Sequence, residues 1–180
     1  MLELKKGGSL DLHKEAGATL TKIRIGAGWD VAEGKTVDLD LSLIAKGGAV
    51  CYYGNKEIPG AKLDKDDRTG ASSDGGADEN IHVDVAALDK EEYAVVISIY
   101  DAVAKGQFFK DVKRAFVEIV DVASGEKKVM NYDITANGGD NSALLVGKLA
   151  KKDGALTFTS VEEFSSKDLN ALAAECGATA

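Results

Sequence analysis

Hydrophobic and polar residues alternate along most of the chain in short runs that are bounded by glycine. In residues 36–43, Val37 and three leucines share one face, whereas Thr36, Asp38, Asp40 and Ser42 share the other. This period of two predicts a half-buried strand. Similar runs occupy residues 20–26, 48–53, 81–85 and 115–122. Residues 94–100 are apolar on both faces except at Ser98, which predicts a central strand that is covered on both sides.

Turn signals join these runs into an antiparallel pattern. Ser124 and Gly125 separate the runs at 115–122 and 127–134, which predicts a hairpin with glycine at a positive φ. Runs at 142–149 and 155–161 bring the total to nine or ten short strands. The sequence therefore predicts an all-β protein, a two-sheet antiparallel β-sandwich.

One short helix is predicted near the C-terminus, where the period of the pattern changes. Ser165 is positioned to cap it, Asp168 follows three residues later, and Gly177 ends it. Its apolar face consists of Leu169, Leu172, Ala173 and Cys176. We expect one domain over residues 1–180, in which residues 162–180 form this helix and a tail.

Charge and length narrow the range of partners. The 180 residues include 22 basic and 30 acidic side chains, a net charge of −8. This balance opposes a groove that follows phosphates, so we expect no nucleic-acid partner. The first residues do not resemble a signal peptide, and the apolar runs are too short to span a bilayer, which favours a cytoplasmic protein.

Carboxylates concentrate in one irregular segment and in the strand before it. Residues 60–80 contain Asp64, Asp66, Asp67, Asp74, Asp78 and Glu79. Asp38 and Asp40 project from one strand face about 7 Å apart, and Asp30 ends a predicted turn at 26–30. Calcium takes several such oxygen ligands, although no segment matches an EF-hand loop. The alternative interpretation is a solvated acidic surface.

Four ordered motifs resemble the TerD family of bacterial tellurite-resistance and stress-response proteins. The motifs are G-A-G-W-D at 26–30, D-L-D-L-S at 38–42, D-D-R-T-G at 66–70 and D-E-N-I-H-V-D at 78–84. The resemblance covers about residues 1–161. It implies a β-sandwich that binds calcium near one end, and partners from the same resistance system, including membrane-associated proteins. The ligands that it implies are Asp30, Asp38, Asp40, Asp66, Asp78 and Glu79, with Asp67 and Asp74 as weaker additions.

The chain also departs from the family pattern. Asp67 stands where asparagine is usual, Ala77 replaces an acidic residue, and the acidic segment is longer. These changes characterise a divergent member and leave open a second hypothesis, an interaction protein on the same fold that has lost the ion.

Catalytic signals are sparse. The two histidines, His13 and His82, have no Cys, His or Glu at metal-ligand spacing, and no nucleophile elbow or phosphate-binding loop is present. We therefore expect a protein that is not an enzyme. An acidic-site hydrolase is the third hypothesis, because two carboxylates can come from any part of a fold.

Overall fold

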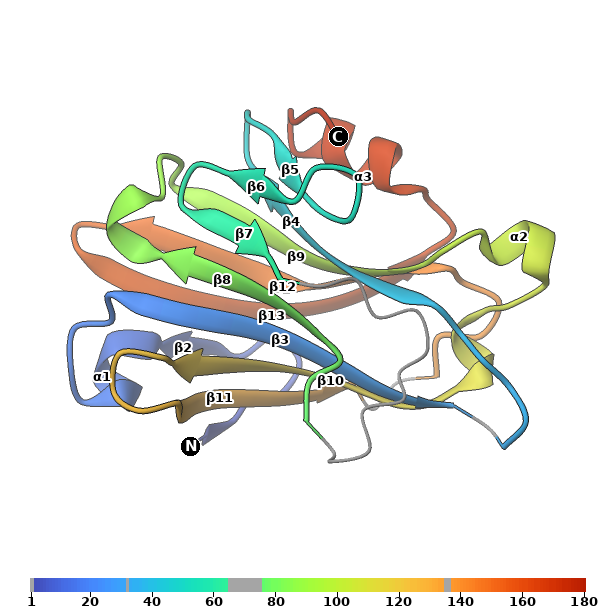
Figure 1. Cartoon of the computed structure of the whole chain (residues 1–180), viewed down its shortest axis with the longest axis horizontal. Helices are drawn as coiled ribbons and strands as arrows, with labels where there is room; N and C mark the ends of the chain where they lie inside the picture. The colour runs from blue at the N-terminus through green and yellow to red at the C-terminus, as the bar shows by residue number, and fades with distance from the viewer. Residues whose placement is uncertain (1, 32, 65–75, 135–136) are drawn as a thin grey trace.

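The computed structural model describes residues 2–31, 33–64, 76–134 and 137–180. Two β-sheets pack face to face (Figure 1). The seven-stranded sheet has the order β1-β11-β10-β3-β8-β7-β6. Its strands are β1 (Leu2–Glu3), β3 (Lys22–Val31), β6 (Glu57–Ile58), β7 (Ala61–Leu63), β8 (Glu79–Asp84), β10 (Val112–Asp121) and β11 (Lys127–Ile134).

The second sheet has six strands in the order β2-β13-β12-β9-β4-β5. They are β2 (Ser9–Asp11), β4 (Leu39–Ala45), β5 (Val50–Cys51), β9 (Glu92–Ile99), β12 (Ala143–Lys152) and β13 (Ala155–Ser165). All pairings in both sheets are antiparallel except that of β1 with β11. The predicted antiparallel β-sandwich is confirmed.

Short helices occupy the connections between strands. They are α1 (Leu12–Ala16), α2 (Ala102–Lys105) and α3 (Leu169–Glu175), with single 3₁₀ turns η1 (Val85–Ala87) and η2 (Phe109–Asp111). The predicted hairpin joins β10 to β11, and Gly125 adopts the expected positive φ of 76°.

The hydrophobic core lies between the sheets and receives side chains from both. Strand β9 is an interior strand of the six-stranded sheet, as predicted. Its residues Val95 and Ile97 enter the main core, whereas Ala94 and Val96 pack with Leu172 of α3 on the opposite face. Helix α3 therefore covers part of the outer face of this sheet.

Three details of the sequence prediction are wrong. Strand β4 is buried along its whole length rather than half-buried, because Ile44 on its outer face packs against α3. The cap of α3 is Asp168, whose carboxylate accepts a hydrogen bond from the Ala171 amide at 2.8 Å, whereas Ser165 ends β13. The segment 26–30 is part of strand β3 and not a turn.

Because Cys51 in β5 is buried, the free energy of unfolding should depend on pH in the alkaline range. Loss of hydration on burial raises the pKa of the Cys51 thiol from 9.0 to about 11. Between pH 9 and 11 the thiol of the folded protein keeps its proton, whereas that of the unfolded protein loses it. The contribution of Cys51 to the free energy of unfolding is therefore complete below pH 9 and is lost as the pH rises toward 11. Each pKa unit corresponds to about 1.4 kcal/mol.

The wild-type free energy of unfolding should therefore fall between pH 9 and 11 by about 2–3 kcal/mol more than that of Cys51→Ala. Urea denaturation at a series of pH values measures this difference. Parallel pH profiles for the two proteins would contradict the assignment.

Candidate functional site

Strand β4 of one sheet contacts β3 and β8 of the other, and two of the predicted acidic residues, Asp78 and Glu79, lie at this junction. Strand β5 spans only two residues and pairs with Leu43 and Ile44, so it does not extend to Leu41. The Glu79 carboxylate of β8 accepts the Leu41 amide hydrogen at 2.7 Å instead. Glu79 is only 1% exposed, so this charge-assisted bond joins the two sheets within the interior.

Asp78 and Trp29 form the other half of the junction. The Asp78 carboxylate accepts a hydrogen bond from the Trp29 amide at 2.9 Å, and the Asp78 amide donates to the Ala27 carbonyl at 2.8 Å. The indole Nε1 of Trp29 donates a hydrogen bond to the Val37 carbonyl at 3.1 Å, and Val37 directly precedes Asp38 in the sequence. Trp29 is buried in the main core, and its bond to Val37 also fixes the chain just before β4.

Two glycines of β3 explain how the segment before Asp78 approaches this strand. A Cβ atom on Gly28 would lie 2.4 Å from the Phe116 ring, and one on Gly26 would lie 2.7 Å from the Ala77 Cβ. Glycine at both positions lets Phe116 and Ala77 lie directly against the β3 backbone. This close packing places Asp78 within reach of the Trp29 amide.

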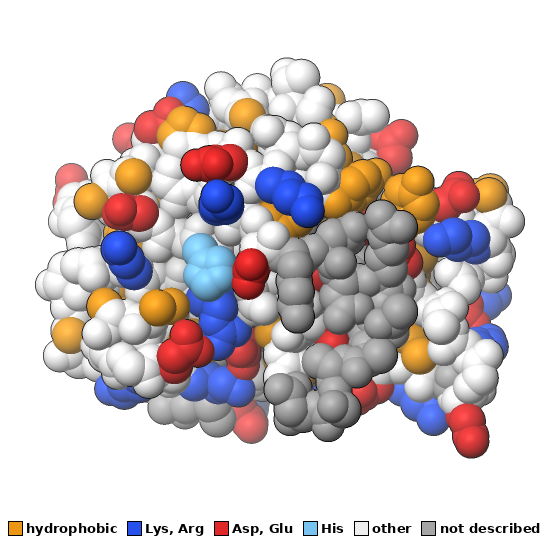
Figure 2. Space-filling view, viewed as in Figure 1, with side chains coloured by type: hydrophobic (Ala, Val, Ile, Leu, Met, Phe, Trp, Pro, Cys, Tyr) orange, Lys and Arg blue, Asp and Glu red, His pale blue; other side chains and the backbone are white. Residues whose placement is uncertain are grey.

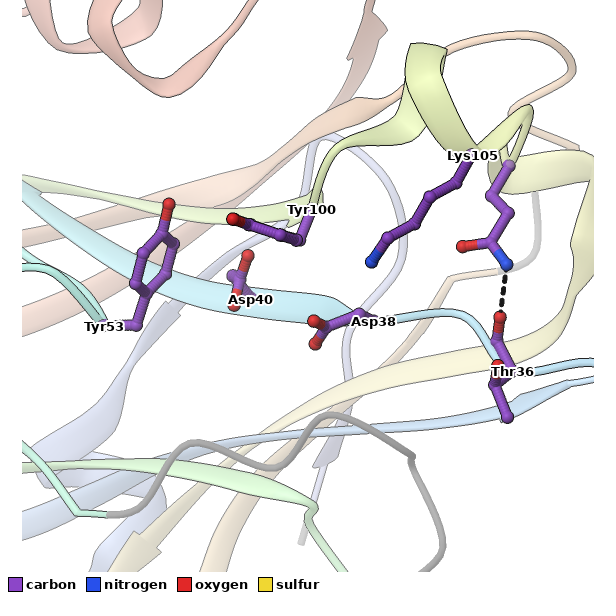
Figure 3. Close-up of a pocket in the computed structure, with 7 residues that line it drawn as sticks. Thr36, Asp38, Asp40, Tyr53, Tyr100 and Lys105 are labelled. Atoms are coloured by element: carbon purple, nitrogen blue, oxygen red, sulfur yellow. Dashed lines mark hydrogen bonds between the residues drawn. The ribbon is translucent and has the colours of Figure 1, made fainter.

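Asp38 and Asp40 face a cavity on the outer side of the six-stranded sheet (Figure 3). The cavity has a volume of about 330 Å³. It is lined by Thr36, Asp38, Asp40, Tyr53, Tyr100, Lys105 and Gln107. Leu39 and Leu41 point into the core, so the intervening Asp40 points outward, yet it is only 5% exposed.

Among the described residues, aromatic rings and the Lys105 ammonium also line this cavity. The rings of Tyr53 and Tyr100 meet edge to face with centroids 5.6 Å apart, and the Lys105 ammonium lies 4.9 Å from the Tyr100 centroid. Burial, followed by the charge of Asp40, raises the pKa of the Tyr53 hydroxyl. The negative charge of the carboxylates therefore acts across the cavity.

The eight predicted ligands do not all have the same surroundings. Asp40, Asp78 and Glu79 are buried, Asp38 is half-buried, and Asp30 is exposed near the end of β3. Asp66, Asp67 and Asp74 lie outside the described residues. In the described part of the chain, no group of three Asp, Glu, His or Cys side chains is close enough to hold a metal ion.

Sequence reasoning missed Tyr53, Tyr100 and Lys105. Tyr53 follows another tyrosine and precedes a glycine, and Tyr100 directly follows the buried β9 strand. A tyrosine at the end of a buried strand indicates a partly exposed ring at the protein surface. The sequence alone does not show which residues lie on the other side of the cavity from that ring. The contact between these residues arises from pairing of distant strands.

The geometry defines a class, an all-β sandwich with two carboxylates at the junction of its sheets and two more in a cavity beside β4. A family model described as "TerD domain" matches residues 1–175. The chain therefore belongs to the TerD family, as its motifs indicated, and the match extends beyond residue 161 through the whole of α3. No helix of the described residues is long and apolar enough to cross a membrane.

Relatives in this family carry resistance and stress names. The tellurium resistance protein TerD of Alcaligenes sp. is 32% identical, over 89% of this chain and 88% of its own length. The general stress protein 16U of Bacillus subtilis is 30% identical, over 89% of each chain. The crystal structure of a homologue of the telluride resistance protein TerD from Streptomyces coelicolor A3(2) superposes with a TM-score of 0.67 at 18% identity, covering 89% of this chain and 99% of that one.

Proposed function

We propose that this TerD-family protein binds calcium ions at the end of the sandwich where Asp38 and Asp40 face their cavity. It would act as a binding or scaffolding module of the tellurite-resistance and stress-response type, and not as an enzyme. The observation that supports this most strongly is that Asp40, although 5% exposed, shares a cavity with a second carboxylate. Two carboxylates in a partly desolvated site repel each other, and a divalent cation reverses the sign of that interaction.

The chemistry of the donors fits calcium. Calcium is a hard cation that takes about six to eight oxygen ligands from carboxylates, carbonyls and water. Asp38 and Asp40 would hold the ion from the sheet side, and Asp78 and Glu79 would brace the junction beside it through their bonds to β3 and β4. The ion would supply positive charge that neutralises the cluster.

Further parts of the proposal concern location and partners. We propose a cytoplasmic protein whose partners belong to a tellurite-resistance system, including membrane-associated proteins, and which does not bind nucleic acid. The net charge of −8 supports the last point. On the face shown in Figure 2, basic and acidic side chains are interspersed and form no continuous basic field among the coloured residues.

A calcium titration followed by Trp29 fluorescence tests the proposal, with magnesium as the competing ion. Trp29 is the one tryptophan of the chain and is hydrogen-bonded to Asp78. We expect saturation with a Kd between about 10⁻⁷ and 10⁻³ M, an increase in melting temperature and its reversal by chelator. Asp40→Asn, which keeps the shape and removes one charge, should weaken binding about tenfold or more.

Asp153→Asn is the matched control, because it removes the same charge at an exposed turn between β12 and β13. Its calcium affinity should equal that of the wild type. A flat calorimetric trace together with an unchanged melting temperature would refute calcium binding.

One observation favours a second candidate, an interaction protein without a bound ion. Lys105 lines the same cavity as Asp38 and Asp40, so a resident ammonium already contributes positive charge there. In that case Lys105→Met would destabilise the protein and leave it unresponsive to calcium. If the cavity holds calcium, Lys105→Met should instead bind the ion more tightly, because a competing charge is removed.

A further inference from the structure

Three large hydrophobic side chains are strongly exposed among the described residues, and all three surround one cleft. They are Tyr53, Tyr100 and Val103, at 41%, 45% and 85% exposure. The cavity above Asp38 continues into a second cavity of about 650 Å³, and the two share Asp40, Tyr53 and Tyr100. Exposed apolar groups clustered around a polar cleft mark an interaction site, whereas scattered ones do not.

Tyr52, Tyr53 and Tyr100 form a row of contacting rings along the cleft, which we call the cage together with Asp38 and Asp40. Tyr52 and Tyr53 meet edge to face at 5.2 Å, and Tyr53 meets Tyr100 in the same way at 5.6 Å. Carboxylates form the floor of this cage, because Asp38 and Asp40 line the same cavity (Figure 3). Aromatic faces combined with negative charge attract an organic cation more strongly than either group does alone.

The cage already holds an ammonium group. Lys105 of the four-residue helix α2 places its Nζ 4.9 Å from the centroid of Tyr100. Lys105 is exposed, so this cation–π contact stabilises it by only about 0.5–1 kcal/mol. The side chain therefore shows which chemistry the cage accepts, and its weak attachment lets a ligand displace it.

The second cavity indicates the kind of molecule that carries the cation. Its wall includes apolar groups of Ile99, Ala102, Val103 and Leu169, directly beside the cage. A free amine would leave this wall uncovered, whereas a polypeptide with an apolar residue next to a lysine would cover it.

We infer that the cleft binds a lysine side chain on an exposed segment of a partner protein. The partner's ammonium replaces that of Lys105 beside the Tyr100 ring, in the cavity lined by Asp38 and Asp40, and an apolar neighbour packs against Val103 and Leu169. This inference depends on the cation–π geometry at Tyr100 and on the second cavity, and calcium bound to Asp38 and Asp40 would compete with the lysine. The assay is therefore run in chelator, so that its outcome is independent of the proposed calcium site.

The probe is the peptide acetyl-Ala-Lys-Leu-Ala-amide, followed by NMR shifts of the tyrosine rings. Lys105→Ala removes the internal competitor and should bind the peptide several-fold more tightly than the wild type, with saturable shifts at Tyr53 and Tyr100. Adding Tyr100→Leu to that variant should weaken binding by about twofold to 30-fold. Lys110→Ala is the matched control, because Lys110 lies over Phe108 outside the cleft, and it should leave peptide affinity unchanged.

Two comparison ligands make the result decisive. A peptide with norleucine in place of lysine should bind Lys105→Ala at least about tenfold more weakly, since the cation is lost. Butylammonium should also bind more weakly than the lysine peptide, because it cannot reach the second cavity. Equal affinity for the norleucine peptide, equal affinity for butylammonium, or no saturable binding to Lys105→Ala would each overturn the inference.

Discussion

Replacing Trp29 by alanine should destabilise the protein by about 3–5 kcal/mol through the cavity left in the core. Trp29 is 3% exposed and packs in the main core. The change also removes the indole Nε1 bond to the Val37 carbonyl, which contributes about 1 kcal/mol more. Urea denaturation followed by circular dichroism measures the total.

Trp29→Phe separates the two contributions. Phenylalanine keeps an aromatic ring in the core but has no indole N–H, so the loss should be well below that of Trp29→Ala. If calcium binds at the proposed site, calorimetry should also show weaker binding by both variants, because Val37 directly precedes Asp38. A loss below about 1 kcal/mol for Trp29→Ala would contradict the role of this residue in the core.

Glu79→Ala should lower the free energy of unfolding by about 3–4 kcal/mol. The Leu41 amide would lose its acceptor in the interior, which costs about 1–3 kcal/mol, and the removed methylene groups contribute the rest. Glu79→Gln keeps a carbonyl that can accept the same hydrogen, so its loss should be clearly smaller.

Glu163→Ala is the control for this prediction, since Glu163 is exposed on β13. It should change stability by less than about 0.5 kcal/mol. Equal losses for Glu79→Ala and Glu79→Gln would show that the charge, and not the hydrogen bond to Leu41, provides the stabilisation.

The alternation of apolar residues was sufficient to predict the sandwich and most of its long strands. The runs at 94–100 and 127–134 correspond closely to β9 and β11. Strands β1, β2, β6 and β7 escaped prediction, because a period of two cannot be recognised in two or three residues. The outer face of β4 was mispredicted because α3, which covers it, packs there from far along the chain.

The candidate site was predicted in part. The common face of Asp38 and Asp40 followed from the strand period and is seen in their shared cavity. The buried bonds of Asp78 and Glu79 could not be predicted, because the Glu79 bond depends on how far β5 extends and the Asp78 bond on close packing at the glycines of β3. The metal-ligand assignments themselves stay predictions.

The packing of Gly26 and Gly28 affects how the G-A-G-W-D motif should be used to diagnose function. Both glycines are required because Phe116 and Ala77 occupy the space of a side chain. A protein on this fold would need them for packing whether or not it binds an ion. Their presence in a genome sequence is therefore evidence for this architecture alone, and ion binding has to be judged from the aspartates that follow.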